Sequence, residues 1–324
     1  MNYIQQAYKG KNDWYHWLFT IVIVFFGWQV LGVLPLVMAA FSKSESTAQF
    51  AAFAKDNFMT AGLDKNFLLF LMLFMFLAGL IFLFIGVKYI HQRSFTSLVT
   101  SRVKIDWKRF FYGFFVWGVL AVVMTYASIL LAPENFTWNF NATQFFILVA
   151  ISFIFIPFQT SFEELLFRGY FMQGIGVLVK NRWVPLLVTS IVFGLLHGTN
   201  PEVAKLGQIT MVYYIGTGLF FGIVTLMDEG TEIALGLHAV NNVTAAFFVT
   251  TDWSVFQTNA LYKDISEPSV SWEMFLPVFI LYPIMLFLFS KKYGWTNWKE
   301  KLTGKITMPE RLTESTESTE STEF

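Results

Sequence analysis

The stretch FLLFLMLFMFLAGLIFLFIGVKYI, residues 67–90, holds one charged side chain, Lys88, in 24 positions. A helix needs about 20 mostly apolar residues to cross roughly 30 Å of hydrocarbon, so this stretch predicts a membrane span. The whole chain shares the bias, because 55% of its 324 residues are hydrophobic and only 14% are charged. This composition excludes a soluble domain of this length and predicts an all-α, polytopic integral membrane protein surrounded by a lipid bilayer.

Similar apolar stretches recur along the chain and predict about eight transmembrane helices, with bounds good to roughly 2–4 residues. The expected spans are 17–41, 67–90, 110–132, 144–161, 183–198, 206–227, 231–250 and 272–290. The first exceeds the ~7–15-residue apolar region of a signal peptide, so we interpret it as a retained span. Pro157 and three glycines in 157–182 predict a bent or broken helix there.

Lysine and arginine are divided unequally between the two sides that eight spans define. With the N-terminus in the cytoplasm, the inside segments hold 17 of the 22 and the outside segments hold 5. The positive-inside rule then predicts a multi-pass protein of the cell (inner or plasma) membrane with both termini cytoplasmic. Residues 1–305 are expected to form a single membrane domain, and the Ser/Thr/Glu-rich residues 306–324 a disordered cytoplasmic tail.

Several other classes of function are excluded by composition. The chain contains no cysteine, which excludes disulfides, thiolate catalysis and lipidation on sulfur. Its net charge is zero and it has no strongly basic stripe, so no nucleic-acid partner is expected. The sequence does not define an oligomeric state.

Ionisable residues within spans cost about 2.5–3.5 kcal/mol each on insertion scales, so those that occur there are candidates for function. On a helix, Glu164 and Arg168 lie on one face as an ion pair, whereas Glu163 is rotated about 100° away and is left free. The candidates are Glu163, Glu164, Arg168, His197, His238, Asn241 and Asn242.

Each group also has a purely structural explanation. The charges can form a solvated cluster at the cytoplasmic interface, and His197, just before a turn, can anchor the end of a span. His238 and Asn242, at i and i+4, can form hydrogen bonds between helices. Two histidines and a free carboxylate on separate helices nevertheless favour a functional site, because the chain has only four histidines.

Three motifs in these segments resemble those of a known family. Glu163-Glu-Leu-Leu-Phe-Arg168 matches E-E-x-x-x-R, Phe193-Gly-Leu-Leu-His197 matches F-x-x-x-H, and His238-Ala-Val-Asn-Asn242 matches H-x-x-x-N. In this order, across about 144–250, they resemble the CAAX protease and bacteriocin-processing family of intramembrane endopeptidases. That family includes the type II CAAX prenyl endopeptidases and many bacterial Abi-type proteins.

The resemblance implies a role for each motif residue. Glu163 would be the general base, and His197 would help to hold and polarise the attacking water. His238 and Asn242 would form the oxyanion hole, and Glu164 with Arg168 would orient Glu163. The implied substrate is a membrane-bound peptide or protein, with a prenylated CAAX-type tail as one family-level candidate.

Two alternatives remain open. Glu163, His197 and His238 are also a ligand set for catalytic zinc with an open position. We favour a glutamic mechanism without a cofactor, because Asn242 suits a hydrogen-bonded oxyanion better than a zinc sphere. The rival class is a catalytically silent membrane scaffold or bacteriocin-immunity protein on the same fold. A proton-coupled transporter is disfavoured because no inverted repeat is visible.

The expected spans create one geometric conflict. With straight helices, Glu163 lies near the cytoplasmic face and His197 roughly 20 Å along the fifth span, so the two would not meet. We therefore expect the fourth helix to tilt and continue past residue 161, or the fifth to begin later than residue 183. Either change would let Glu163, His197, His238 and Asn242 converge on one water-accessible cavity.

Overall fold

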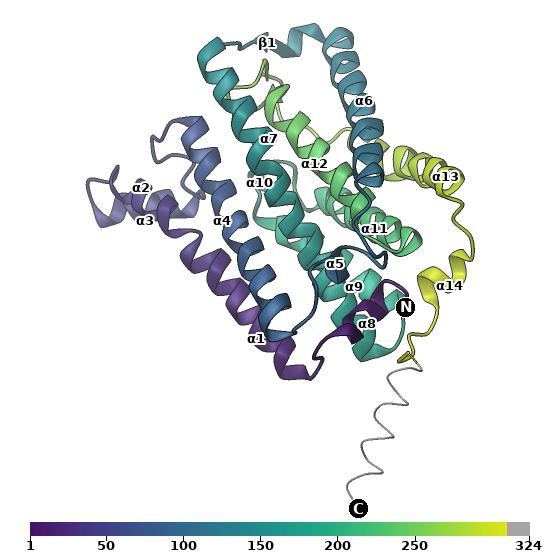
Figure 1. Cartoon of the computed structure of the whole chain (residues 1–324). Helices are drawn as coiled ribbons and strands as arrows, with labels where there is room; N and C mark the ends of the chain where they lie inside the picture. The colour runs from purple at the N-terminus through teal and green to yellow at the C-terminus, as the bar shows by residue number, and fades with distance from the viewer. Residues whose placement is uncertain (310–324) are drawn as a thin grey trace, which may run out of the picture.

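The computed structural model describes residues 1–309, and helices make up most of this part of the chain, as the all-α expectation requires. Among these residues, six helices are long and apolar enough to cross a membrane. Figure 1 shows that most of the long helices run side by side as a bundle. The six are Trp14–Phe41, Lys65–Ile90, Trp107–Leu131, Ala142–Val179, Gln208–Asp228 and Trp272–Tyr293. Residues 310–324 of the expected tail lie outside the described part.

The fourth expected span, 144–161, ends too early. The helix runs on as α7 (Ala142–Glu164), a π-helical segment (Leu165–Phe171) and α8 (Met172–Val179). Pro157 lies inside α7, and the expected break is a stretch of wider π-helical turns instead. Such turns are frequent at functional sites. Glu163 therefore lies in the middle of a 38-residue helix rather than at its end.

Two of the eight expected spans form shorter helices. They are α9 (Trp183–Leu196) and α12 (Glu232–Phe247), of 14 and 16 residues. Helix α12 packs against α6 (Trp107–Leu131), α7 and α11 (Met211–Asp228), and most of its residues are buried. Because protein surrounds α12, its polar side chains face other helices and a cavity rather than lipid.

Small residues permit the close packing around α12 and α9. A Cβ atom placed on Gly236 of α12 would lie 2.0 Å from the carbonyl oxygen of Phe110 on α6. A Cβ atom on Gly218 of α11 would lie 2.7 Å from the carbonyl oxygen of Ser190 on α9. Close backbone approach of this kind is typical of helices packed within membranes.

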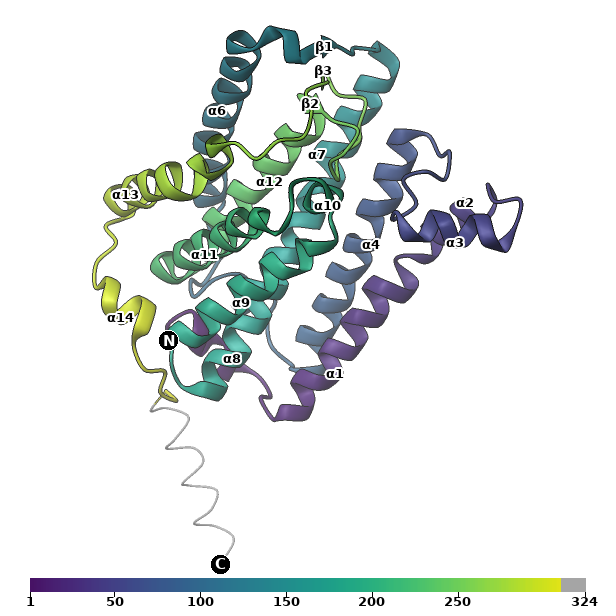
Figure 2. The same ribbon diagram turned by 180° about the vertical axis from the view of Figure 1, so that it is seen from behind.

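Three of the spans contain α1 (Trp14–Phe25) with α2 (Leu34–Phe41), α4 (Lys65–Ile85) and α13 (Tyr282–Tyr293). The short helices outside the spans are α3 (Thr47–Lys55), α5 (Thr96–Val99), α10 (Pro201–Leu206) and α14 (Trp298–Thr303). A small sheet has the order β1 (Phe136–Trp138), β3 (Tyr262–Asp264) and β2 (Val249–Thr250). Figure 2 shows the N-terminus and α14 at one end and the three strands at the other.

We call these the terminus end and the sheet end. The terminus end comprises residues 1–13, 86–109, 177–182, 228–232 and 290–309, and the sheet end residues 42–65, 132–141, 197–207 and 248–273. Long-range contacts join the terminus end: the Tyr3 hydroxyl donates to the Leu98 carbonyl at 2.7 Å, and the Ile306 amide donates to the Lys180 carbonyl at 2.9 Å. Ile306 is buried, so the packed domain extends one residue past the expected boundary at 305.

Candidate active site

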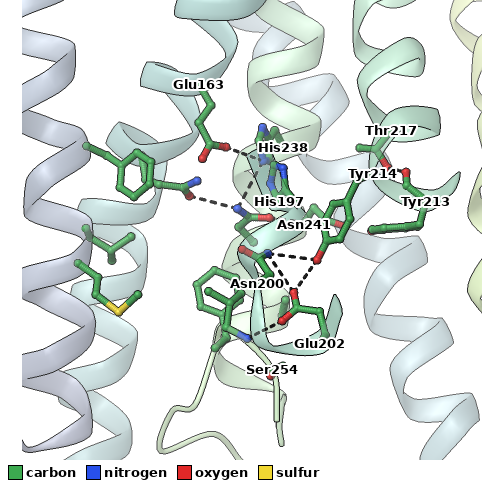
Figure 3. A pocket seen from close by; sticks show the side chains of 18 of the residues that line it. Glu163, His197, Asn200, Glu202, Tyr213, Tyr214, Thr217, His238, Asn241 and Ser254 are labelled. Carbon is green, nitrogen blue, oxygen red and sulfur yellow. Dashed lines mark hydrogen bonds and ion pairs between the residues drawn. The ribbon is translucent and has the colours of Figure 1, made fainter. Parts of the chain in front are cut away.

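The four residues singled out by the motifs line one cavity of about 380 Å³. Glu163 comes from α7, His197 from the turn that follows α9, and His238 and Asn242 from α12. Figure 3 shows the labelled Glu163, His197 and His238 side chains gathered around this space. The expected convergence is therefore confirmed, and the continuation of the fourth helix past residue 161 makes it possible. The roles of the four residues remain predictions.

His197 is held by its own helix and by α11. Its Nδ1 lies 2.8 Å from the Phe193 carbonyl oxygen, one turn earlier in α9. Because a carbonyl oxygen only accepts, Nδ1 carries the proton, and Nε2 of the neutral ring keeps a lone pair. The imidazole stacks on Tyr214 with ring centroids 4.5 Å apart and an interplanar angle of 21°. His197 is thus fixed as a hydrogen-bond acceptor at the cavity wall.

His238 is held by a buried ion pair. Its Nδ1 lies 2.8 Å from Glu164 Oε1, which also accepts from Arg168 Nη1 at 3.0 Å. Arg168 Nη2 donates to the Gly218 carbonyl oxygen at 3.1 Å. Glu164 and Arg168 are both fully buried, so each charge depends on the other for compensation. The ion pair expected from the four-residue spacing is present.

That Glu164 and Arg168 orient Glu163 remains a prediction, because among the described residues no hydrogen bond joins either side chain directly to Glu163. Glu164 instead contacts His238, through the atoms given above. The physical reason is that adjacent residues on a helix point about 100° apart, so Glu164 and Glu163 address different neighbours. The His238–Glu164 contact joins two helices, which motif spacing within one helix does not reveal.

Of the two adjacent glutamates, Glu163 is the one that is not paired with Arg168. Its Oε2 lies 3.5 Å from His238 Nε2, beyond ordinary hydrogen-bond length, and the side chain is 13% exposed. Among the described residues this oxygen has no hydrogen-bond partner, although it is buried. A buried carboxylate oxygen without a protein partner is suited to bind a water molecule in the cavity.

Asn242 belongs to a chain of amide hydrogen bonds. Its Nδ2 donates to Gln159 Oε1 at 3.1 Å and lies 3.4 Å from His238 Nε2. Asn241 donates to Asn242 Oδ1 at 3.1 Å and accepts from the Trp117 indole at 3.1 Å. Sequence reasoning missed Gln159, although its position four residues before Glu163 puts both on one face of α7.

Glu202 of α10 is a second residue that sequence reasoning missed. Its Oε1 accepts from the Tyr214 hydroxyl at 2.5 Å and from Asn200 Nδ2 at 3.1 Å, and its Oε2 accepts from the Val255 amide at 3.0 Å. Figure 3 shows Glu202 and Asn200 beside Tyr214 at the cavity wall. Glu202 therefore joins α10, α11 and the 248–273 loop. Its closeness to His197 in sequence was the only available signal.

A second cavity of about 530 Å³ shares Glu163 and His197 with the first. We call the 380 Å³ space the first chamber and the 530 Å³ space the second chamber. The walls of the second chamber include the apolar Trp28, Met75 and Phe162 and the polar Gln29 and Asn57. Both volumes are in the range of binding pockets, about 300–1,000 Å³. Glu163 and His197 thus lie where the two chambers meet.

The candidate zinc ligands were tested against this geometry. Both histidines bind an acceptor through Nδ1, which is also how metal-ligating histidines are oriented. However, within residues 1–309 no group of three or more His, Asp or Glu side chains is placed to hold a metal ion. Glu163, His197 and His238 therefore do not fit a zinc site as arranged here, and we derive no step through a metal.

Comparison with known proteins supports the resemblance seen in the motifs. Residues 141–244 match the family model described as "Type II CAAX prenyl endopeptidase Rce1-like", which confirms the resemblance over this segment. The chain is also 29% identical over 288 residues to "Uncharacterized protein YyaK" of Bacillus subtilis (strain 168), covering 86% of this chain and 92% of that protein. No solved structure matches the chain. The family match and the apolar helices support an integral membrane protein of the CAAX-protease type.

Proposed function

We propose that this protein hydrolyses peptide bonds of membrane-associated polypeptides, using a water molecule activated by Glu163. The observation that carries the proposal is the convergence of three kinds of group on one cavity. These are a carboxylate oxygen that has no hydrogen-bond partner among the described residues, two histidines whose Nδ1 atoms face an acceptor, and a side-chain amide. Hydrolysis of an amide needs a base, a held water and donors for the oxyanion within reach of one another.

In the first step, Glu163 removes a proton from water at the junction of the two chambers. His197 Nε2 accepts a hydrogen bond from the other O–H of that water. This hydrogen bond directs a lone pair of the water oxygen at the scissile carbonyl carbon. The new C–O bond forms as the carbonyl π electrons move onto oxygen, which gives a tetrahedral oxyanion.

In the second step, the oxyanion is stabilised by His238 and Asn242. Since His238 Nδ1 donates to Glu164, Nε2 can donate only from an imidazolium. An imidazolium at His238 and the Arg168 guanidinium balance the carboxylates of Glu163 and Glu164, so the buried group has no net charge. The Asn242 amide, 3.4 Å from His238 Nε2, supplies the second donor.

In the third step, the tetrahedral intermediate breaks down. Its oxygen electrons re-form the carbonyl, the C–N bond breaks, and Glu163 returns its proton to the leaving nitrogen. The products are a carboxyl group and an amine, and the site is ready for another water molecule. Glu163 therefore acts first as the base and then as the acid, and the proton that it takes from water is the one that it gives to the leaving nitrogen.

The experiment that tests this function compares purified wild type, Glu163→Gln and the exposed control Glu45→Gln on tagged membrane peptides. Glu163→Gln keeps size and hydrogen bonding but removes the base, so turnover should fall by at least about 100-fold with substrate binding retained. Glu45→Gln should behave as wild type. A Glu163→Gln protein as active as wild type would contradict the proposal.

The same assay distinguishes the scaffold alternative. A catalytically silent scaffold would bind membrane peptides equally well in wild type and Glu163→Gln and would cleave none of them. Peptide capture without cleavage, at concentrations where binding is saturated, would therefore favour the scaffold.

A further inference from the structure

The loops that complete the active-site walls all come from the sheet end. Ser254 lines the first chamber, Asn57 and Met59 line the second, and Val255 lines both. Of the described residues, none from the terminus end lines either chamber. We therefore expect substrate to enter both chambers from the sheet end.

The helical segment that follows Glu163 blocks access to the site from the terminus end. The π-helical segment Leu165–Phe171 continues from α7 toward the terminus end, and its first six residues are buried. Tyr170 is fully buried and packs in a cluster with Leu98 and Phe167. The Tyr170 hydroxyl donates to the Trp17 carbonyl oxygen at 3.1 Å and lies 2.8 Å from His91 Nε2, so polar contacts also hold this side chain in place. The site is thus separated from the terminus end by packed protein.

The two ends carry opposite charge. The terminus end has 15 Lys and Arg against 6 Asp and Glu, whereas the sheet end has 5 against 9. In membrane proteins, Lys and Arg are enriched in the short loops that lie on the cytoplasmic side of the membrane. This rule places the terminus end in the cytoplasm and the sheet end on the other side of the membrane.

We propose that the active site opens on the extracytoplasmic side and cleaves membrane-anchored polypeptides in a segment exposed there. The statement about cleavage rests on the proposed function, while the statement about the opening rests on loops and charge alone. The second chamber adjoins Glu163 and His197, and the part of its wall formed by Trp28, Met75 and Phe162 takes an apolar side chain next to the scissile bond. Cytoplasmic proteins with lipid-modified tails do not reach a site that opens on this side.

The first test measures which side the cavity faces, without reference to activity. The chain has no cysteine, so each single substitution introduces the only thiol. Glu134→Cys is at an exposed position of the sheet end and Ser254→Cys is at the cavity wall, whereas Lys104→Cys and Lys299→Cys are at exposed positions of the terminus end. Each variant is treated with a membrane-impermeant maleimide in intact spheroplasts and after permeabilisation.

Labelling of Glu134→Cys and Ser254→Cys in intact spheroplasts is expected, with Lys104→Cys and Lys299→Cys labelled only after permeabilisation. The reverse pattern would overturn the inference. If Ser254→Cys fails to accumulate, the exposed pair Glu134→Cys and Lys104→Cys decides the result. Because cysteine-free wild type gives no signal, it serves as the background control.

The second test asks from which side substrate is taken. A reporter with one transmembrane helix carries the same apolar cleavage segment either at its extracytoplasmic end or at its cytoplasmic end. Co-expression with the full chain should cleave the first reporter at least 10-fold more than the second, and Glu163→Gln should abolish this cleavage. Glu163-dependent cleavage of the cytoplasmic reporter alone would overturn the inference and leave the proposed function intact. Cleavage of neither reporter by wild type, with the labelling pattern as expected, would instead count against the proposed function.

Discussion

At the scale of single residues, the site depends on how two adjacent glutamates are divided between two tasks. Glu164 is fully buried and engaged by Arg168 and His238, whereas one oxygen of Glu163 has no hydrogen-bond partner among the described residues. The difference arises from the direction of each side chain around α7 rather than from residue type. Substitutions at the two positions should therefore have different consequences.

Glu164→Gln should lower both stability and turnover. Removing the charge leaves Arg168 uncompensated in a fully buried site, and losses of about 3–5 kcal/mol are typical when one partner of such a pair is removed. Glu164→Gln also weakens the acceptor that holds His238, so kcat should fall more than KM rises. Thermal unfolding in detergent and steady-state kinetics measure the two effects. Wild-type unfolding temperature in this variant would contradict the buried pair.

Asn242→Ala should lower turnover by about 10²–10³-fold with little change in substrate affinity. Its amide contact strengthens only when the oxyanion forms, so the loss appears in kcat. Gln159→Ala, which removes only the acceptor that orients Asn242, should have a smaller effect in the same direction. A rise in KM without a change in kcat would mean that Asn242 binds substrate instead.

His91 gives the fold a pH dependence that is separate from catalysis. Burial lowers the pKa of its imidazole from 6.5 to about 4, while the ring contacts the Lys11 carbonyl and the Tyr170 hydroxyl. The folded state thus favours neutral His91, so its contribution is complete above pH 6.5 and is lost as pH falls from 6.5 toward 4. Thermal unfolding should show lower stability at pH 5 than at pH 7.5, with a smaller difference in His91→Gln. Equal pH dependence in both proteins would contradict this origin.

At the scale of elements, most of the bundle could be predicted from the sequence because apolar length alone marks a span. The expected span 67–90 agrees with the observed helix Lys65–Ile90 to within two residues. Continuation of the fourth helix past residue 161 was one of two expected alternatives, but its full extent to residue 179 was not predicted, because proline and glycine favour a break locally while tertiary packing supports a π-helical stretch. Contacts between helices, such as His238 with Glu164, depend on which faces meet, and periodicity within one helix does not contain that information.

The packing of α12 against α6 predicts a stability effect at Gly236. A methyl group there would meet the Phe110 carbonyl oxygen, and because that atom belongs to the backbone the helices must separate. Gly236→Ala should therefore destabilise the fold by about 1–3 kcal/mol, the usual range for overpacking. Gly198→Ala is the matched control, since its added Cβ would have no neighbour within 4 Å. Equal unfolding temperatures for the two variants would contradict the close packing.

At the scale of the whole molecule, the bundle places the four candidate residues beside two adjoining chambers. Helix α7, the turn after α9 and helix α12 contribute these residues, and the loops of one end cover the chambers. The match to the CAAX-endopeptidase model covers 141–244 and thus includes all four candidate residues. The charge difference between the two ends sets which side of the membrane the site serves, in the orientation that we propose.

The central claim is that Glu163 activates water without the help of a metal ion. The most direct measurement is turnover of a membrane peptide by wild type and Glu163→Gln in an excess of chelator, with peptide binding followed in parallel. The account predicts full wild-type turnover under chelation and at least about a 100-fold loss in Glu163→Gln, with binding unchanged in both. Wild-type turnover that disappears with chelator and returns with added zinc, or a fully active Glu163→Gln protein, would contradict it.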